Sequence, residues 1–367
     1  MEPLGSESFF CVRWDQSRRK AGKMTNLRPR WGLVTMADEP AQLVLAFIGH
    51  HLDLGADAIH LFLDQPQPDI QAALGDLSNC HVIVTDDAYW QEVHGCARPG
   101  AQTRRQELNA NHVYETCDLD WLVHMDADEF LIPKGNLRTE LGYVPEGIGY
   151  LLMPTLERAW PADPFPDQIF AGAFRAQLPG RLSVQRHVFG NRAPFTLRGL
   201  SGHVRGKSFA RTKQGYRMGI HRPMPPTGGE DDDDAIPSLV CNSMELLHFD
   251  GLTPLHWMIK RLRYAALPQF RRMTDPKGHR DRQLVHLRNE VQSRRSALRM
   301  FRQMQVYDAA EEARLRALGL LVDRSVNLAS PVRQIWPDFE VDHSMAAFDL
   351  DLRARNQEFL RKLPYRL

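Results

Sequence analysis

The chain has 367 residues, of which 43% are hydrophobic and 25% are charged, and its formal net charge is +1. This profile is typical of a soluble globular protein with room for one large domain or two. The near-neutral charge provides no general attraction for nucleic acid, so we expect no nucleic-acid partner.

Residues 1–29 form a basic leader without a structural pattern, and we expect them to be poorly structured. The leader lacks the continuous apolar core of a signal peptide, and no stretch of the chain approaches the length of a membrane span. The five cysteines are scattered and lack metal-type spacing, which fits buried thiols in a reducing compartment. We therefore expect a cytoplasmic protein, with contact to the inner face of the membrane left open.

Strands and helices are predicted to alternate along residues 31–126. Each predicted strand is almost entirely apolar, which indicates a parallel sheet covered by helices on both faces. The predicted strands cover 31–36, 58–64, 81–87 and 120–126, and the helices between them cover 41–54, 68–77 and 101–117.

The second half of the chain gives weaker patterns. A strand is expected at 148–155, short strands at 207–209 and 216–220, and a strand followed by an amphipathic helix at 244–267. The acidic run in 225–238 is interpreted as a solvated loop. Residues 275–320 and 352–363 are predicted to be helical. These patterns predict an α/β fold whose main domain spans 30–265, with a helical C-terminal extension at 266–367.

The segment "WLVHMDADEFLIP" places three carboxylates, Asp126, Asp128 and Glu129, directly after a buried strand. In an extended chain, Asp126 and Asp128 point to the same side, where two carboxylates repel each other unless a cation lies between them. Oxygen ligands of this kind suit Mg²⁺ or Mn²⁺. The alternative is that both aspartates cap a helix that begins near Glu129.

Other acidic residues also follow predicted strands. Glu39, Asp64 and Asp86 lie at or just beyond strand ends. In open α/β sheets, ligands bind at the carboxyl ends of the strands. The sequence therefore predicts a ligand site at this edge.

Several segments resemble family 2 glycosyltransferases of the GT-A fold, in particular a bacterial subgroup with an Asp-x-Asp-Glu-Phe metal motif. The resemblance covers about residues 30–265 and departs from the family at Ala37-Asp38-Glu39, where Arg-Asn-Glu is usual. The matching segments are "DWLVHMDADEFL", "ADEPAQLVLAFIGHHLDLGADAIHLFLD", "QTRRQELNANHVYE", "GKSFARTKQGYRMGIHRP" and "LLHFDGLTPLHWMIKRLRY".

The resemblance implies a GT-A-like, Rossmann-like fold and a metal-dependent transfer of a sugar from a nucleotide-diphospho-sugar to the hydroxyl of a carbohydrate or glycolipid acceptor. It further implies inversion at the anomeric carbon, with Mn²⁺ or Mg²⁺ as cofactor, in cell-surface or exopolysaccharide synthesis. Asp126, Asp128 and the late His248 are the expected metal ligands, although His248 could equally be a core histidine. His221 is a further candidate for binding metal or substrate.

The resemblance implies that Asp64 accepts hydrogen bonds from the nucleotide base of the donor, and Glu39, Arg105, Asp126 and Lys207 are the other residues expected to bind the donor. Arg104 and Lys260 are further candidates for the diphosphate, since cationic side chains pair with phosphate oxygens. The competing interpretations are a helix cap for Glu39 and a turn before Pro66 for Asp64.

An inverting transfer also needs a general base near the acceptor hydroxyl. Glu157 is the first candidate, followed by Asp163 and Asp167. A local ion pair with Arg158 is the alternative for Glu157.

Two other functions fit parts of the pattern. The altered loop at residues 37–39 favours a non-catalytic carbohydrate- or partner-binding protein on the same fold, and the Asp-x-Asp pair also fits a Mg²⁺-dependent phosphohydrolase. The Arg-rich helices after residue 256 suit either an anionic membrane surface or ordinary solvation.

Overall fold

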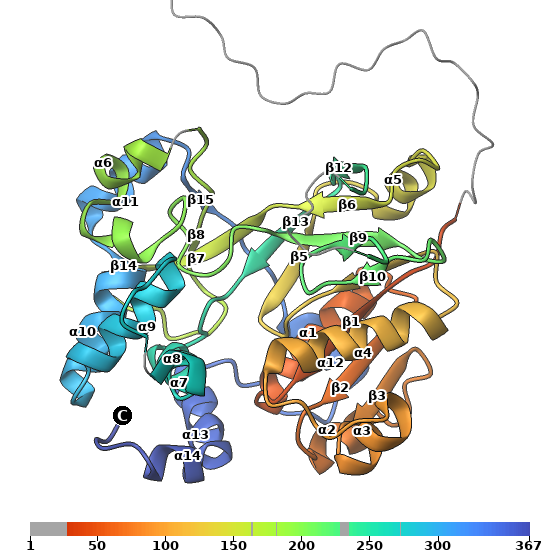
Figure 1. Cartoon of the computed structure of the whole chain (residues 1–367), viewed down its shortest axis with the longest axis horizontal. Helices are drawn as coiled ribbons and strands as arrows, with labels where there is room; N and C mark the ends of the chain where they lie inside the picture. The colour runs from red at the N-terminus through yellow and green to blue at the C-terminus, as the bar shows by residue number, and fades with distance from the viewer. Residues whose placement is uncertain (1–27, 163, 181, 228–234, 272) are drawn as a thin grey trace, which may run out of the picture.

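The first third of the chain alternates strands and helices in the computed structural model, which describes residues 28–162, 164–180, 182–227, 235–271 and 273–367. Figure 1 shows the strands of this part flanked by its helices. In chain order these elements are β1 (Trp31–Ala37), α1 (Ala41–Asp53), β2 (Ala58–Leu63), α2 (Pro68–Leu74), β3 (Cys80–Val84), α3 (Asp87–His94), α4 (Gln102–Thr116) and β4 (Trp121–His124).

The middle of the chain contains shorter elements. They are β5 (Glu129–Pro133), α5 (Leu137–Tyr143), β6 (Tyr150–Met153), β7 (Thr155–Pro161), β8 (Ala173–Arg175), η1 (Leu182–Val184), α6 (Gln185–Phe189), η2 (Gly190–Phe195), β9 (Lys207–Arg211), β10 (Arg217–Met218), β11 (Pro223–Met224), β12 (Ser238–Val240) and β13 (Met244–His248).

The last third is mainly helical. It contains α7 (Pro254–Ala265), α8 (Pro268–Arg271), α9 (His279–Glu290), α10 (Arg294–Gln305), β14 (Val306–Tyr307), α11 (Ala309–Ala317), β15 (Leu321–Asp323), α12 (Ala329–Ile335), α13 (Met345–Arg355) and α14 (Gln357–Arg361). The helix predicted at 352–363 is divided at Asn356, where the backbone leaves the helical region.

The main sheet has the strand order β12-β6-β9-β4-β1-β2-β3. Strands β3, β2, β1 and β4 are parallel neighbours, whereas β9 lies antiparallel between β4 and β6. The predicted α/β class is therefore confirmed: a mostly parallel sheet flanked by helices, with a helical C-terminal part.

Alternation along β1 explains why helices cover both faces of this sheet. Leu33 packs in the same cluster as Phe47 of α1, whereas its neighbour Val34 packs with Val113 of α4. Successive side chains of a strand point to opposite faces. An apolar strand therefore needs a helix on each side.

A second sheet, with the order β15-β8-β7-β13-β5, lies beside the first. Strand β5 begins at Glu129 and pairs antiparallel with β13, so that Glu129 lies opposite His248. The alternative in which Asp126 and Asp128 cap a helix that begins near Glu129 is therefore wrong. The residues after Glu129 are apolar and end at a proline, which suits a strand better than a helix.

Residues beyond 265 are joined to the second sheet and also pack against a helix of the main sheet. Strand β14 pairs with β7, β15 pairs with β8, and α12 packs against α1. The domain boundary at 265 stays a prediction.

The predicted leader lies almost wholly outside the described residues, as does the acidic run at 230–234. Within the described part of the chain, no helix combines the length and hydrophobicity needed to cross a membrane.

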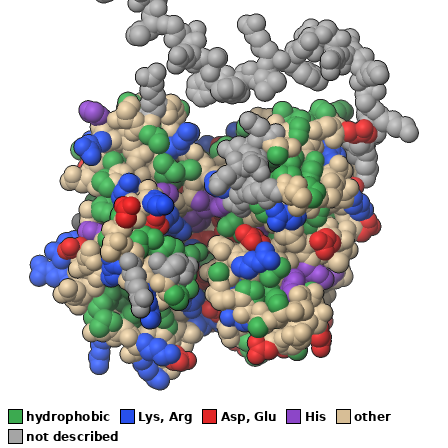
Figure 2. All heavy atoms as spheres, viewed as in Figure 1, with side chains coloured by type: hydrophobic (Ala, Val, Ile, Leu, Met, Phe, Trp, Pro, Cys, Tyr) green, Lys and Arg blue, Asp and Glu red, His purple; other side chains and the backbone are tan. Residues whose placement is uncertain are grey.

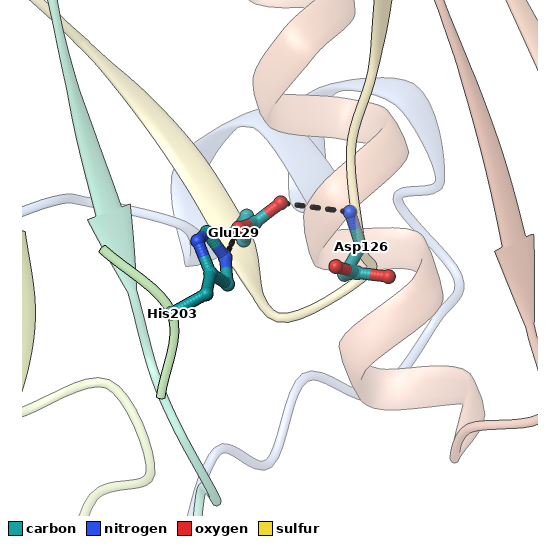
Figure 3. A group of neighbouring side chains, drawn as sticks. All are labelled: Asp126, Glu129 and His203. Atoms are coloured by element: carbon teal, nitrogen blue, oxygen red, sulfur yellow. Dashed lines mark hydrogen bonds and ion pairs between the residues drawn. The ribbon is translucent and has the colours of Figure 1, made fainter. Parts of the chain in front are cut away.

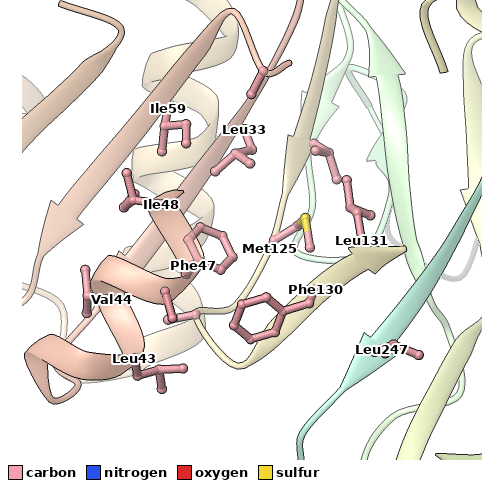
Figure 4. Close-up of a cluster of buried hydrophobic side chains, with 14 of the residues drawn as sticks. Leu33, Leu43, Val44, Phe47, Ile48, Ile59, Met125, Phe130, Leu131 and Leu247 are labelled. Carbon is pink, nitrogen blue, oxygen red and sulfur yellow. The ribbon is translucent and has the colours of Figure 1, made fainter. Parts of the chain in front are cut away.

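Phe130 of β5 joins the two sheets through the core. Its ring meets those of Phe47, Phe170 and Phe249 edge-on at centroid distances of 6.0, 5.4 and 5.6 Å. Figure 4 shows Phe130 beside Phe47 within this cluster. The ring is fully buried and directly follows the carboxylates of residues 126–129, so its packing fixes where these carboxylates lie.

Replacing Phe130 with alanine should lower the free energy of unfolding by about 3–5 kcal/mol, because a buried aromatic ring is lost and a cavity remains. Urea denaturation followed by tryptophan fluorescence measures the change. The matched control is Leu350→Ala, since Leu350 is 73% exposed and its loss should have little effect. Equal destabilisation by both substitutions would contradict this packing.

Candidate active site

The acidic turn, residues Asp126–Glu129, connects β4 of the main sheet with β5 of the second sheet. The backbone N–H of Asp126 donates to Glu129 Oε2 at 2.9 Å, and the N–H of Phe249 donates to the carbonyl of Asp128 at 2.9 Å. These bonds fix the turn where the two sheets meet. The space-filling view shows a hollow between the two halves of the molecule, with His and acidic side chains visible in it (Figure 2).

Lys207 provides a buried positive charge between two of these carboxylates. Its Nζ lies 3.0 Å from Asp126 Oδ2 and 3.3 Å from Glu129 Oε2, and it donates to the carbonyl of Ile220 at 2.9 Å. Burial alone would lower the pKa of Lys207, but the two carboxylates outweigh it and raise the pKa. Lys207 therefore carries its charge, and it helps to hold the pKa of Asp126 well below the usual range against the effect of burial.

Asp128 faces a different lysine. Its side chain is 4% exposed, with Oδ2 2.5 Å from Lys260 Nζ and 3.8 Å from His248 Nε2. Lys260 comes from α7, whose first turn is fixed by Thr253 accepting the His256 N–H at 3.0 Å. Burial opposes the charge of Lys260, but Asp128 and neighbouring carboxylates raise its pKa.

Three histidine rings lie close to one another beside the acidic turn. The His203 ring lies 4.4 Å from that of His221 and 5.3 Å from that of His248, and His203 Nε2 is 3.0 Å from Glu129 Oε1. Burial is the main reason that the pKa of His203 falls well below its usual value and that of His221 falls to about 2. Both imidazoles are therefore neutral at pH 7, the form that binds metals.

The residues of this turn fit a divalent cation. Asp126, Glu129 and His203 each offer a ligand atom, and these atoms all lie within 4.8 Å of one another (Figure 3). Among the described residues, the buried Nδ1 atoms of His203 and His248 have no hydrogen-bond partner. Carboxylate oxygens with an imidazole nitrogen suit Mn²⁺, and oxygen-rich sites suit Mg²⁺.

The predicted metal ligands are only partly brought together. Asp128 and His248 are neighbours, whereas Asp126 groups with Glu129 and His203, two residues that were not predicted as ligands. Glu129 could have been found, because it belongs to the same acidic segment. His203 lies in a Gly- and Arg-rich stretch without periodicity, so no local pattern marks it as a ligand.

The predicted donor-binding residues Asp64 and Arg105 bind each other. Arg105 donates from Nε and Nη2 to the two oxygens of Asp64 at 2.8 and 2.7 Å, and Arg98 lies 2.8 Å from Asp64 Oδ1. Arg104 lies on the surface, where it pairs with Glu107 at 3.4 Å. Asp64 thus anchors α4 to the end of β2, and α4 in turn presents the amide of Gln106 to Asp126 at 2.6 Å.

Glu39 lies at the end of β1, 3.2 Å from His256 Nε2. Burial alone would raise its pKa, but His256, Lys260 and Arg263 lower it to about 2. Glu39 is therefore ionised at pH 7 and tied to α7. It does not cap α1, whose first turn has no side-chain cap.

The three candidates for the general base are in different situations. Glu157 is fully buried, its partner is Arg175 rather than Arg158, and it accepts from the N–H groups of Ser201 and Gly202 at 2.7 and 2.6 Å. Asp167 is exposed, and Asp163 lies outside the described residues. The oxygens of Glu157 thus hold the loop that carries His203.

Close packing explains why this loop contains a glycine. A Cβ added to Gly202 would lie 2.6 Å from Glu157 Oε2 and 2.9 Å from His248 Cε1. Ser201 links the same loop to Asp250, whose oxygen lies 2.8 Å from Ser201 Oγ. The loop is therefore fixed by buried polar contacts on both sides.

Comparisons with known proteins give only distant likenesses. No protein-family model and no curated protein matches the chain. Glucosyl-3-phosphoglycerate synthase from Mycobacterium tuberculosis is similar at 15% identity over 38% of this chain and 50% of its own, with a TM-score of 0.25. HddC from Yersinia pseudotuberculosis is similar at 8% identity over 60% of this chain and 93% of its own, with a TM-score of 0.33. The chain thus spans half the length of the first of these structures.

Replacing Glu157 with glutamine should lower the free energy of unfolding by about 3–5 kcal/mol, because Arg175 would keep a buried charge without a carboxylate to balance it. Chemical denaturation measures the loss. The matched control is Asp323→Asn, which breaks a pair with Arg316 whose side chains are 76% and 41% exposed and should cost at most about 1 kcal/mol. A Glu157→Gln protein as stable as the control would show that Glu157 does not hold this loop.

Proposed function

We propose that the protein is a metal-dependent glycosyltransferase that moves a sugar from a nucleotide-diphospho-sugar to an acceptor hydroxyl, with inversion. One observation carries the proposal. The acidic turn at the end of β4 brings three carboxylates, two lysines and buried neutral histidines to one place. Such a site can bind a cation and a diphosphate together. The assignment to cell-surface or exopolysaccharide synthesis follows from the sequence resemblance alone.

Asp126, Glu129 and His203 would hold Mn²⁺ or Mg²⁺, and Asp128 and His248 beside them would be further metal ligands. A bound ion would supply positive charge for the departing diphosphate. The chain itself contributes the two lysines in different ways. The side chain of Lys207 is fully buried and positions Asp126, whereas that of Lys260 is 26% exposed and can contact a phosphate oxygen.

The remaining site assignments follow from the same geometry. We infer that Glu157 positions the His203 loop, because both of its oxygens already accept hydrogen bonds. Asp163 and Asp167 stay predictions for the general base, and His221 stays a prediction for metal or substrate binding. Asp64 and Arg105 support the donor site through each other.

One observation favours the alternative of a non-catalytic binding protein. The carboxylate of Asp64 is already occupied by Arg98 and Arg105, so its contact with a nucleotide base would require one of these pairs to open. Turnover distinguishes the two functions. Release of nucleoside diphosphate from a UDP-sugar or GDP-sugar in the presence of Mn²⁺ would exclude a purely binding protein.

Binding of UDP and GDP should depend on Mn²⁺, and His203→Ala and Asp128→Asn should each weaken it by on the order of tenfold or more, because each removes a donor near the ion. Isothermal titration calorimetry with and without Mn²⁺ measures the effect, and a thermal shift checks it through ligand stabilisation. The matched control is Asp69→Asn on the exposed face of α2, which should bind normally. Equal nucleotide binding by the unchanged protein and the three variants, or nucleotide binding without Mn²⁺, would overturn the metal-dependent proposal.

A further inference from the structure

A cavity of about 900 Å³ opens between the segment of η1, α6 and η2 and the start of α9. Its lining includes Arg186, His187, Lys277 and Arg282 and contains no Asp or Glu among the described residues. These elements lie in the same half of the molecule as α10 (Figure 1), and Figure 2 shows Lys and Arg side chains at several places on that half. The cavity therefore has a positive lining.

The positive charge of the cavity is not used up by salt bridges. Arg186, Lys277 and Arg282 are exposed, and in the part of the chain that the structure describes none of them pairs with an acidic side chain. The nearby Asp281 is engaged at the start of α9, where it accepts from the N–H groups of Lys277 and Gly278 at 3.1 and 3.3 Å. An anion entering the cavity would thus meet cations that have no competing carboxylate; Arg282 donates to the carbonyl of Pro194 at 3.5 Å.

The cavity shares a wall with the acidic turn. His279 lines the cavity, and its Nε2–H donates to the carbonyl of Gly202 at 2.7 Å. The next residue, His203, contacts Glu129 at 3.0 Å. One short loop therefore separates a positive cavity from the negative turn where the donor is proposed to bind.

The lining also has an apolar part. Leu182, Pro194 and Leu197 contribute carbon surface beside the cations. A pocket that combines apolar surface with a few charged groups suits an organic anion better than a free inorganic ion.

We propose that this cavity binds the anionic group, a phosphate or a carboxylate, of the sugar acceptor. The inference rests on the proposed function, because it assigns the acceptor of the same transfer. It implies that the enzyme discriminates against neutral acceptors, since arginine and lysine form stronger, charge-assisted hydrogen bonds with phosphate and carboxylate than with a hydroxyl.

Binding of three probes to the full chain tests the proposal. Glucose 6-phosphate and glucuronate represent the two kinds of anion, and glucose is the neutral control. Titration followed by calorimetry should show binding of at least one anion, weakened by added salt, and binding of glucose at least about tenfold weaker. Arg186→Gln combined with Arg282→Gln should weaken anion binding by about tenfold or more, whereas Arg333→Gln, on exposed surface of α12, should leave it unchanged.

The outcomes separate this inference from the proposed function. Loss of anion binding in the double variant, with Mn²⁺-dependent UDP binding intact, supports the cavity as a separate subsite. Equal binding of all three probes, or anion binding that the double variant retains, overturns the inference even if UDP still binds. Failure of UDP binding with anion binding intact would instead remove the transferase proposal and leave an anion-binding cavity.

Discussion

The burial of the acidic turn depends on the positive charges that face it. Asp128 and Glu129 are almost inaccessible to solvent, and such carboxylates are costly to bury unless they are paired. Lys207 lies between Asp126 and Glu129, and Lys260 faces Asp128. The ammonium groups of the two lysines thus balance most of the negative charge of the three carboxylates. The negative charge that is not balanced, together with the histidine nitrogens that lack a hydrogen-bond partner, leaves a place for a further cation.

The rest of the fold places these groups. Phe130 fixes β5 in the core, and the pairing of β5 with β13 sets Glu129 opposite His248. The 201–203 loop is held by Glu157 and by α9, so His203 reaches the turn from a third direction. Residues from distant parts of the chain converge because two sheets meet at the acidic turn.

Local patterns were sufficient to predict the parallel strands and the cluster of carboxylates that follows the last of them. The apolar runs of β1 to β4 and the Asp-x-Asp spacing are patterns that extend over only a few residues, and at this range the sequence is informative about structure. The ion pair of Glu157 with Arg175 depends on the antiparallel register of β7 and β8, and that of Asp64 with Arg105 spans 41 positions. His203 could not be predicted, because its position is set by tertiary contacts of a loop without a pattern.

The most direct test of the account is a crystal structure with Mn²⁺ and UDP, measured at the manganese absorption edge. We expect one anomalous peak within about 2.0–2.3 Å of carboxylate oxygens of the acidic turn and of an imidazole nitrogen of His203 or His248, with the diphosphate as a further ligand. A Mn²⁺–UDP complex bound elsewhere, with Lys207 and Lys260 still the only cations at the turn, would contradict it.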